Sequence, residues 1–383
     1  MSGAFQAALH RAGIVRPWRP LTSTPPAHSG RPLIWSLDNF QWDPRTLAQV
    51  EADIRQHRPL WIRIANFYPR ITQLLARLGD QRLNVLWKQE FCGYDSANGP
   101  LLAASGIDPA LYVSQMASSG HNVVPYTFDE WNHSQISMLM PGQSPLHILP
   151  VAAKPPLGDV RQLRRATREA FGIPSQATVF GVGGLLHPEK GIEHMVQVFL
   201  ETNTKDEEHL LCALVVDWDD DTESIRARWR HLFGADGMER LHIRVGGYGD
   251  WHWMNQFYAT CDYVLVNSRR DSAPRMVSEP VSCGIPVVAT ASNCGTNHLI
   301  PGLVIADSIV DFTSAAFRLA LARARQVAPT LAWQHVDRNS LRAVREAYLT
   351  LLIREADPCE HDLVQTSARD PASLAILDEL MVF

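Results

Sequence analysis

The stretch YATCDYVLVNSRRDSAPRMVSEPVSCGIPVV, residues 258–288, decides the fold. Two apolar runs within it, DYVLVNS and GIPVV, have the length and the β-branched composition of buried strands. Between them, MVSEPVSCG places apolar and polar residues at near-helical spacing. A strand, a loop, a helix and a second strand make a βαβ unit, and sheets of such units bind small ligands at the carboxyl ends of their strands. The stretch therefore predicts an α/β domain and the edge of its sheet where a ligand binds.

Two carboxylates lie eight positions apart in this stretch: Asp271 in the expected loop and Glu279 inside the short helix. An acidic loop at a strand end suits a polyhydroxylated ligand, and the free backbone N–H groups at the start of the helix suit a phosphate. The same spacing also fits a solvated loop aspartate and an ordinary helical glutamate. The residues alone leave both interpretations open.

A second segment, GVGGLLHPEKG at residues 181–191, follows a predicted strand and precedes a predicted helix. Its glycines allow the backbone to approach a ligand closely, and Lys190 at the entrance of the helix can pair with a phosphate. Lysine is rare in this chain, with four residues against 31 arginines, which gives Lys190 added weight. The segment has neither the GK[ST] of a Walker A loop nor a GxGxxG fingerprint, so a structural turn also fits it.

Composition narrows the class of protein. A chain of 383 residues is long enough for two domains that each bury a core. Its net charge of -5 gives no reason to expect a nucleic-acid partner, because such proteins usually carry a basic surface. The six cysteines form no CxxC pairs, which favours free thiols in a reducing compartment over disulfides or a zinc site.

The sequence contains no apolar run of transmembrane length and no cleavage-like leader at its start. A cytoplasmic protein is the expectation, and peripheral membrane contact stays open. The oligomeric state is not specified by any feature of the sequence.

Strand-like and helical runs alternate twice along the chain, which predicts two α/β domains with parallel sheets that face a cleft. The predicted segments are an irregular lead-in at 1–31, an N-terminal domain at 32–152, a linker at 153–175, a C-terminal domain at 176–330, a C-terminal helix at 331–356 and a tail at 357–383. The acidic tail is expected to be mobile or loosely packed.

Taken in order, these motifs resemble the nucleotide-sugar-dependent glycosyltransferases of the GT-B fold, in particular the retaining family 4. GGLLHPEKG, residues 183–191, resembles the "GRL…PEKG" signature of that family. NSRRDSAPRMVSEPVSCGIPVVA, residues 267–289, resembles its "PSR.E.FGRV..EA.A.G.PVVA" signature. The resemblance implies two Rossmann-like α/β domains that face a cleft, with the C-terminal helix packing back toward the first domain.

The resemblance also implies a role for each carboxylate. Glu279 matches the glutamate that holds the ribose hydroxyls of the nucleotide, and an ionised carboxylate accepts hydrogen bonds from a vicinal diol well. Asp271 matches the glutamate that faces the transferred sugar, so at this position the chain has an aspartate, whose side chain is shorter. Its oxygens are expected to bind sugar hydroxyls and to stabilise positive charge in the transition state.

The same family binds the donor diphosphate with groups that match this chain. Lys190 matches the lysine that contacts the diphosphate and stabilises the leaving group. The backbone N–H groups of Arg275 and Met276 match those that surround it, and the Arg275 side chain would add further donors. Gly183 and Gly184 complete the expected donor-nucleotide site. The resemblance implies a UDP- or GDP-type sugar as co-substrate, with no other cofactor.

The chain departs from the family pattern at several positions. The arginine that precedes the family lysine is missing, because Gly184 or Leu185 occupies its place. The family histidine after a central strand of the first domain is also missing, and Lys88 and Glu90 stand near that position. His298 lies near the usual acid of another loop. We therefore name Lys88, Glu90 and His298 as expected cleft residues.

The acidic run DWDDD, residues 217–221, raises the alternative of a metal site, because carboxylates at DxD spacing suit a divalent cation. It follows a predicted strand where the family has a loop, which favours a solvated acidic turn. The expectation is a site without a metal.

The resemblance implies an enzyme that transfers a sugar from a nucleoside diphosphate to an acceptor hydroxyl with retention of configuration. The acceptor would be a small molecule, a glycan or a secondary metabolite. Two alternatives stay open: a GT-B phosphorylase or synthase that uses a sugar phosphate, and a catalytically silent relative that binds a nucleotide.

Overall fold

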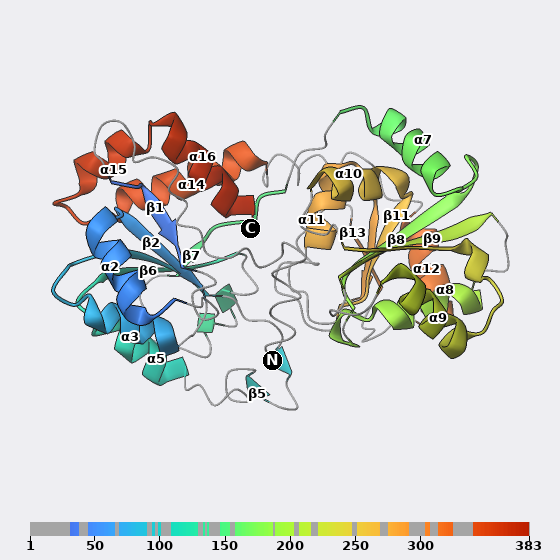
Figure 1. The fold of residues 1–383 in the computed structure, drawn as a ribbon, viewed down its shortest axis with the longest axis horizontal. Coiled ribbons are helices and arrows are strands. Elements are labelled where there is room, and N and C mark those ends of the chain that lie inside the picture. The colour runs from blue at the N-terminus through green and yellow to red at the C-terminus, as the bar shows by residue number, and fades with distance from the viewer. Residues whose placement is uncertain are drawn as a thin grey trace. The chain divides into compact units, whose positions relative to one another are not determined.

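The computed structural model describes two compact units (Figure 1). The N-terminal unit lies within Pro17–Ala152 and Asn339–Phe383, and the C-terminal unit lies mainly within Ala153–Arg338. The described residues are 31–37, 45–65, 69–89, 94–95, 99–100, 109–128, 133–134, 136–137, 146–153, 158–186, 188–202, 207–215, 221–246, 251–268, 275–290, 303–306, 313–324 and 340–382.

The N-terminal unit has a parallel sheet in the order β1-β2-β3-β6-β7. Its strands are β1 (Ile34–Ser36), β2 (Trp61–Ala65), β3 (Asn84–Lys88), β6 (Asn122–Thr127) and β7 (His147–Ile148). A small antiparallel pair joins β4 (Tyr94–Asp95) to β5 (Gly99–Pro100). Each strand of this sheet is hydrogen-bonded to the strand of the sheet that comes next along the chain, as the preference for short connections predicts.

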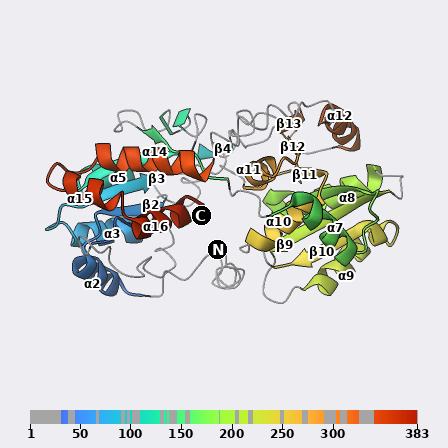
Figure 2. The ribbon, with the colours of Figure 1, turned by 90° about the horizontal axis from the view of Figure 1, so that it is seen from above.

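Both faces of this sheet are covered by helices. Trp35, Ile62 and Val85 pack on one face with α2 (Leu47–His57), α3 (Pro69–Arg77) and α5 (Pro109–Ala117). Trp61 and Leu86 point to the other face, where they meet α14 (Leu341–Arg354), α15 (His361–Ser367) and α16 (Pro371–Val382). Parallel sheets need both faces buried, and the last helices of the chain supply the second layer (Figures 1 and 2). The expected packing of the C-terminal helix on the first domain is confirmed.

The expectation that the tail 357–383 is mobile or loosely packed is wrong. Two helices occupy it, and Val364 and Leu377 in them are fully buried. Two of its carboxylates form ion pairs in the structure: Glu360 Oε1 lies 2.6 Å from Arg31 Nη2, and Asp357 Oδ2 lies 2.8 Å from Arg82 Nε. An acidic composition therefore did not mean a solvated segment.

Asn84, at the amino end of β3, fixes the start of this tail. Its Nδ2 donates to Leu60 O at 3.0 Å and to Glu360 Oε2 at 2.8 Å. Its Oδ1 accepts from the Asp357 backbone N–H and from Asn122 Nδ2, both at 2.9 Å. The amino edge of the sheet thus has a polar network in which the asparagine side chains are satisfied by protein groups.

The C-terminal unit has a parallel sheet in the order β10-β9-β8-β11-β12-β13. Its strands are β8 (Thr178–Leu185), β9 (Glu208–Val215), β10 (Leu241–Val245), β11 (Tyr263–Val266), β12 (Val287–Thr290) and β13 (Leu303–Ala306). From the central strand β8, the next two strands along the chain, β9 and β10, lie toward one edge of the sheet. The later strands β11, β12 and β13 lie toward the other edge. The strand order therefore reverses between β8 and β11, and sheets of this type bind ligands at such a reversal.

Helices cover both faces of this second sheet (Figures 1 and 2). Cys212 and Leu214 pack with α8 (Ile192–Thr202), α9 (Thr222–Phe233) and α12 (Ser314–Ala324). Leu211 and Ala213 point the opposite way, into a cluster that includes α10 (Trp251–Thr260) and α11 (Arg275–Ser282). Successive side chains of β9 thus point to opposite faces of the sheet, and both faces are buried under helices. Two Rossmann-like α/β domains are confirmed.

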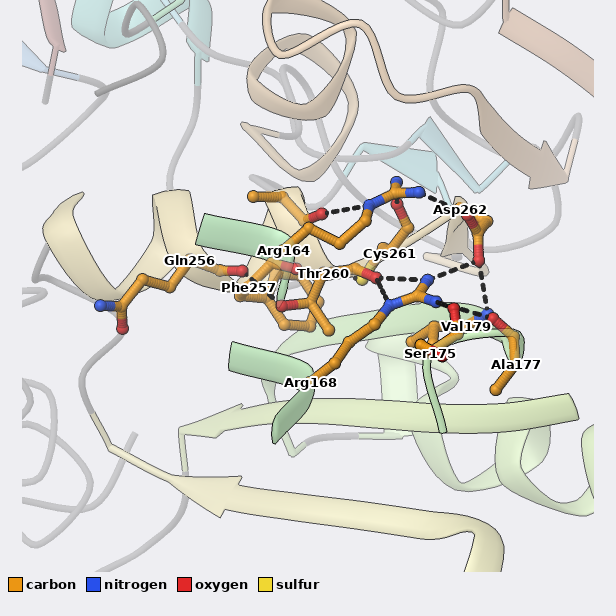
Figure 3. Close-up of polar contacts among 11 residues, drawn as sticks. Arg164, Arg168, Ser175, Ala177, Val179, Gln256, Phe257, Thr260, Cys261 and Asp262 are labelled. Atoms are coloured by element: carbon orange, nitrogen blue, oxygen red, sulfur yellow. Dashed lines mark hydrogen bonds and ion pairs between the residues drawn. The ribbon is translucent and has the colours of Figure 1, made fainter. Parts of the chain in front are cut away.

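Helix α7 (Val160–Ala170) lies within the residues expected as a linker, 153–175, and packs in the C-terminal unit. Figure 3 shows two of its arginines at the end of α10. Arg164 donates to Ala259 O, to Cys261 O and to Asp262 Oδ1 at 2.7 to 2.9 Å.

Arg168 is the more buried of the two, and its side chain is 7% exposed. It donates to Thr260 O at 3.0 Å, to Ala177 O at 2.9 Å and to Asp262 Oδ2 at 2.8 Å. Helix ends leave carbonyls without partners and favour cations, so the two arginines complete the C-terminus of α10. The basic face of α7 thus binds one particular helix end.

A pair of histidines bridges β9 and β10 on the same face of the sheet as α7. His209 Nδ1 lies 3.0 Å from His242 Nε2, and the Phe171 ring packs edge-on against His242. Burial, with smaller contributions from His209 and Arg226, lowers the pKa of His242 to about 4. Burial and nearby arginines also lower the pKa of His209. Both imidazoles are therefore neutral near pH 7.

Because the pKa values of His209 and His242 are lowered in the folded protein, we expect the protein to lose stability in mild acid. The folded-state pKa of His242 lies below the unfolded value of 6.5, so the stabilisation is complete above pH 6.5. It is lost as the pH falls toward about 4, because the unfolded chain binds the proton more readily. Urea unfolding at pH 7.5 and at pH 4.5 measures the loss, which is roughly 2 kcal/mol. The His242→Gln variant should lose most of this pH dependence, and an unchanged dependence would contradict the assignment.

Candidate functional site

The candidate site lies at the carboxyl ends of β8 and β11, where the strand order reverses. The turn η2 (Pro188–Lys190) follows β8 closely, and Lys190 in it is half-buried. Asn267 directly follows β11 and is 2% exposed. Both sequence motifs are therefore placed at one edge of the sheet.

Gly191 and Asn267 bring the two motifs into contact. Asn267 Nδ2 lies 3.4 Å from Gly191 O, across 76 residues of sequence. Gly191 has a φ of 61°, and a Cβ on it would lie 2.5 Å from the Asn267 carbonyl oxygen. Only glycine fits this position, because both the backbone conformation and the close approach exclude a side chain. The glycine that ends the PEKG sequence is thus required by a contact between the two motifs.

A matched pair of glycine variants tests this contact. Gly191→Ala is expected to lower stability by about 2–4 kcal/mol, of which only about 1 kcal/mol comes from the left-handed backbone. Gly172→Ala is the control, since Gly172 has a φ of 65° but nothing within 4 Å of the added Cβ. Thermal and urea unfolding of both variants compare them. Equal losses would mean that the Asn267 contact contributes nothing.

The end of β8 also approaches the start of α11. A Cβ on Gly183 would lie 3.1 Å from Met276 Cε and 3.1 Å from Ala213 O, so the missing side chain makes room for Met276. Gly184, with a φ of 123°, has nothing within 4 Å of such a Cβ. Gly183 therefore allows close packing, and the φ of Gly184 is one that glycine adopts without strain.

Glu279 lies on α11 and is 5% exposed. The hydroxyl of Tyr258, on α10, donates to Glu279 Oε2 at 2.7 Å. Tyr258 is itself fully buried and also contacts Met276 Sδ at 3.4 Å. Burying a carboxylate is costly unless hydrogen bonds satisfy it, and a phenol that fixes its orientation is one such partner. The structure thus holds this carboxylate in place near the carboxyl edge of the sheet.

Tyr258 did not emerge as a site residue from the sequence. It falls among Met254, Phe257 and Cys261 on the apolar face of a helix, where an aromatic residue is normally core. The one feature of the sequence that could have indicated a polar role is the hydroxyl group, because a buried tyrosine usually forms a hydrogen bond with a polar group. The partner is 21 residues away, beyond the reach of local periodicity.

The first residues of α11 are Arg275, which is half-buried, and Met276, which is 5% exposed. The first N–H groups of a helix have no partner within the helix, so this end can receive an anion. The N–H groups at the start of α11 and the Lys190 ammonium are hydrogen-bond donors, and Glu279 is a carboxylate. These groups lie near the carboxyl ends of β8 and β11. The structure brings these residues to the same edge.

The other expected site residues are not at this edge or are not described. Asp271, Glu90 and His298 lie outside the described residues. Lys88 ends β3 in the N-terminal unit, is 8% exposed, and its Nζ lies 5.3 Å from the centre of the Phe128 ring. Buried beside an aromatic ring, Lys88 makes a cation–π contact.

Of the acidic run 217–221, only Asp221 is described. It caps α9: its Oδ1 accepts from the Ser224 backbone N–H at 2.8 Å, and this hydrogen bond lowers the pKa of its carboxyl group. Asp221 thus has a structural role. Within the described ranges no group of three or more metal-binding side chains gathers.

The described cysteines are all free thiols. Burial raises the pKa of Cys212 and Cys261 strongly and that of Cys283 to about 12, so none of these three is a reactive thiolate near neutral pH. Among the described helices, none has both the length and the apolar character needed to cross a bilayer.

Comparison with solved structures identifies the fold. The chain superposes on sucrose-phosphate synthase from Thermosynechococcus elongatus with a TM-score of 0.58 at 15% identity, over 81% of this chain and 78% of that one. A UDP-forming trehalose-phosphate synthase from Burkholderia xenovorans gives 0.56 at 14% identity, over 84% of each chain. Residues 164–308 match the family described as Glycosyl transferases group 1. The chain has the GT-B fold, and its residues 164–308 are similar to the group 1 glycosyltransferases.

One curated relative of this GT-B protein is D-inositol 3-phosphate glycosyltransferase from Stackebrandtia nassauensis. The two are 27% identical over 202 residues, which are 48% of this chain and 44% of the relative. The match thus spans less than half the length of that relative. The matched residues 164–308 contain α10, α11 and the β8–β11 edge, so the similarity to that family includes the candidate site.

Proposed function

We propose that the chain is a retaining glycosyltransferase of the family 4 type that uses a nucleoside diphosphate sugar. The observation that carries the proposal is the buried Glu279 carboxylate, oriented by Tyr258 at 2.7 Å, on the helix that follows β11. It stands at the strand reversal where sheets of this type bind nucleotides. The match to group 1 glycosyltransferases supports a sugar donor as the ligand.

In the proposed site, Glu279 accepts hydrogen bonds from the two ribose hydroxyls of the donor. Tyr258 limits the rotation of the carboxylate, so less freedom is lost when the nucleotide binds. A UDP- or GDP-type donor is proposed, because the ribose and diphosphate are recognised by this edge while the base is not specified.

The diphosphate lies, in this proposal, between Lys190 and the start of α11, with the N–H groups of Arg275 and Met276 as donors. When the bond between the sugar and the leaving phosphate breaks, negative charge builds on the phosphate. A fixed ammonium and a helix start stabilise that charge more than they stabilise the bound donor, which lowers the barrier. Asp271 is proposed to face the transferred sugar. Neutralisation by these groups requires no metal.

The acceptor is proposed to be a small molecule, a glycan or a secondary metabolite with a free hydroxyl, and the reaction to take place in the cytoplasm. The curated relative is named for D-inositol 3-phosphate, and two structural neighbours are named as sugar-phosphate synthases. A phosphorylated polyol acceptor is therefore among the classes to be assayed first.

The assay that tests the proposal measures release of UDP or GDP from a panel of nucleotide sugars, with sugar 1-phosphates as the competing donors. Turnover of a nucleotide sugar with an α-linkage retained in the product supports the proposal. Turnover of only the sugar 1-phosphates would show a phosphorylase instead. The missing family arginine favours a silent relative as the second candidate, for which UDP or GDP would raise the melting temperature without any turnover.

A further inference from the structure

Asn267 is a buried asparagine at the strand reversal of the C-terminal sheet. It directly follows β11, is 2% exposed, and its Nδ2 lies 3.4 Å from Gly191 O. A carbonyl oxygen can only accept a hydrogen bond, so the amide nitrogen must be the atom that faces Gly191. Within the residues that the structure describes, the other polar atom of the amide, Oδ1, makes no hydrogen bond. A buried acceptor without a partner lowers stability, so the fold alone gains little from an asparagine here.

The carbonyl that Asn267 contacts already has another partner. Gly191 O accepts the first backbone hydrogen bond of α8, from the Met195 N–H at 3.0 Å. The N–H of Gly191 donates to Pro188 O at 3.1 Å and closes the η2 turn. Without the asparagine the carbonyl oxygen would still be hydrogen-bonded, so its second donor contributes little to stability. The Asn267 amide therefore restrains the position of Gly191 more than it stabilises the fold.

Lys190 is coupled to this contact by the backbone. It is the last residue of the η2 turn and directly precedes Gly191. A Cβ on Gly191 would lie 2.7 Å from Asn267 Nδ2 and 3.1 Å from Asn267 Cγ, so the amide packs closely against this side of the turn. Consecutive Cα atoms stay about 3.8 Å apart, so a shift of Gly191 also moves the backbone that carries the Lys190 ammonium.

The residue type at position 267 departs from the pattern of the similar family 4 glycosyltransferases. Their signature has proline at this position (PSR), whereas this chain has asparagine (NSR). The ring of proline carries no hydrogen-bond donor, so the contact with the Gly191 carbonyl belongs to this chain and not to the signature. This chain also lacks the family arginine before the lysine, which leaves Lys190 as the cation of this motif. Its exact placement therefore matters more.

We infer that Asn267 is a positioning residue for Lys190: its amide holds the Gly191 carbonyl and so keeps the ammonium where the leaving phosphate develops charge. Asn267 acts through the backbone of the turn and does not touch the substrate. The catalytic consequence rests on the proposed function. The restraint on the turn does not, and it is measured without substrate.

Two variants test this role, Asn267→Ala and Asn267→Leu. Both remove the donor from Gly191 O, and the leucine variant keeps most of the side-chain volume, so agreement between them excludes an effect of an empty space. Thr202→Val is the matched control. Thr202 is 8% exposed, its Oγ1 also lacks a hydrogen-bond partner in the described part of the chain, and it lies at the far end of α8.

Hydrogen exchange of the full chain, followed by mass spectrometry, measures the restraint itself. In both Asn267 variants the peptide that contains Lys190 and Gly191 should exchange about three- to tenfold faster, because one neutral hydrogen bond is lost. Thr202→Val should leave the exchange of this peptide unchanged. The melting temperature of the Asn267 variants should stay within about 3 °C of wild type, because Gly191 O keeps the Met195 N–H.

Steady-state kinetics and a double-mutant cycle measure the catalytic consequence. The kcat of Asn267→Ala should fall about tenfold while the Kd of UDP or GDP changes less than about twofold, because a displaced ammonium weakens binding of the transition state most. In the Lys190→Ala background, Asn267→Ala should lower kcat no further, since it acts through that lysine. Thr202→Val should leave kcat within about twofold of wild type.

Two results would overturn the inference: unchanged exchange of the turn in both Asn267 variants, or an equal loss of kcat in the wild-type and Lys190→Ala backgrounds. A marked fall in melting temperature with an unchanged kcat would show a structural role instead. If the turn exchanges faster in the variants while the wild-type chain transfers no sugar, the proposed function fails and the restraint by Asn267 stands.

Discussion

Replacing Lys190 with alanine is expected to lower kcat for sugar transfer about 100-fold or more, the usual effect of removing one group that stabilises developing charge. Lys190 follows β8 in the η2 turn, and the contact between Gly191 and Asn267 fixes that turn against the end of β11. Charge on the leaving phosphate is greatest in the transition state, so kcat should fall more than donor affinity. Steady-state kinetics with the preferred nucleotide sugar measure both parameters.

Two further variants complete this experiment. Lys190→Arg keeps the positive charge and should recover part of the rate. Arg230→Ala removes one positive charge from the exposed side of α9 and should leave kcat within about twofold, because surface charges act weakly at a distance. A kcat for Lys190→Ala equal to that of wild type would remove Lys190 from the mechanism.

The second large effect is on stability. Arg168→Ala is expected to lower the free energy of unfolding of the C-terminal unit by about 3–5 kcal/mol, as breaking a buried ion pair typically does. The side chain is 7% exposed and binds Asp262 Oδ2 at 2.8 Å as well as three backbone carbonyls at the end of α10 and before β8. Its removal takes a donor from each of these acceptors, while Asp262 keeps the Val179 N–H and the Arg164 guanidinium as partners (Figure 3).

Urea unfolding followed by tryptophan fluorescence measures this effect, with Arg228→Ala as the control. Arg228 is 39% exposed and pairs with Glu193 at 3.4 Å on the surface, so its loss should cost less than about 1 kcal/mol. If Arg168→Ala is no more destabilising than Arg228→Ala, then α7 is not held to the C-terminal unit by this network.

Local pattern predicted the elements that build the fold. The βαβ unit at residues 258–288 is present as β11, α11 and β12, because short β-branched runs and helical spacing are determined by neighbours in sequence. The PEKG turn was found for the same reason. Within the helix expected at 331–356, the structure describes α14 at Leu341–Arg354, and residues 331–339 lie outside the described residues. Local pattern predicted two α/β domains, and the resemblance of the motifs to family 4 glycosyltransferases implied the GT-B fold.

Long-range partners could not be predicted. The tail forms two helices that pack on the N-terminal sheet, and Asn84 binds Glu360 at their start across 276 residues, a separation in sequence at which no periodicity is informative. Arg168 could be recognised as part of a basic helix, but its partner Asp262 lies 94 residues away. The contact between Tyr258 and Glu279 at the candidate site could not be predicted either. Tyr258 lies among apolar residues in the sequence, so the pattern predicted a core residue and gave no sign that its hydroxyl orients Glu279.

The central claim, that the carboxyl edge of β8 and β11 binds a nucleotide through Glu279, is tested most directly by calorimetric titration of UDP and GDP into the wild-type chain and into Glu279→Gln. The substitution keeps the shape of the side chain and its contact with Tyr258 while removing the charge. We expect one of the two nucleotides to bind wild type and its Kd to rise about 10- to 100-fold in the variant, because charge-assisted hydrogen bonds are lost. Equal affinity in both proteins, or no binding of either nucleotide to wild type, would contradict it.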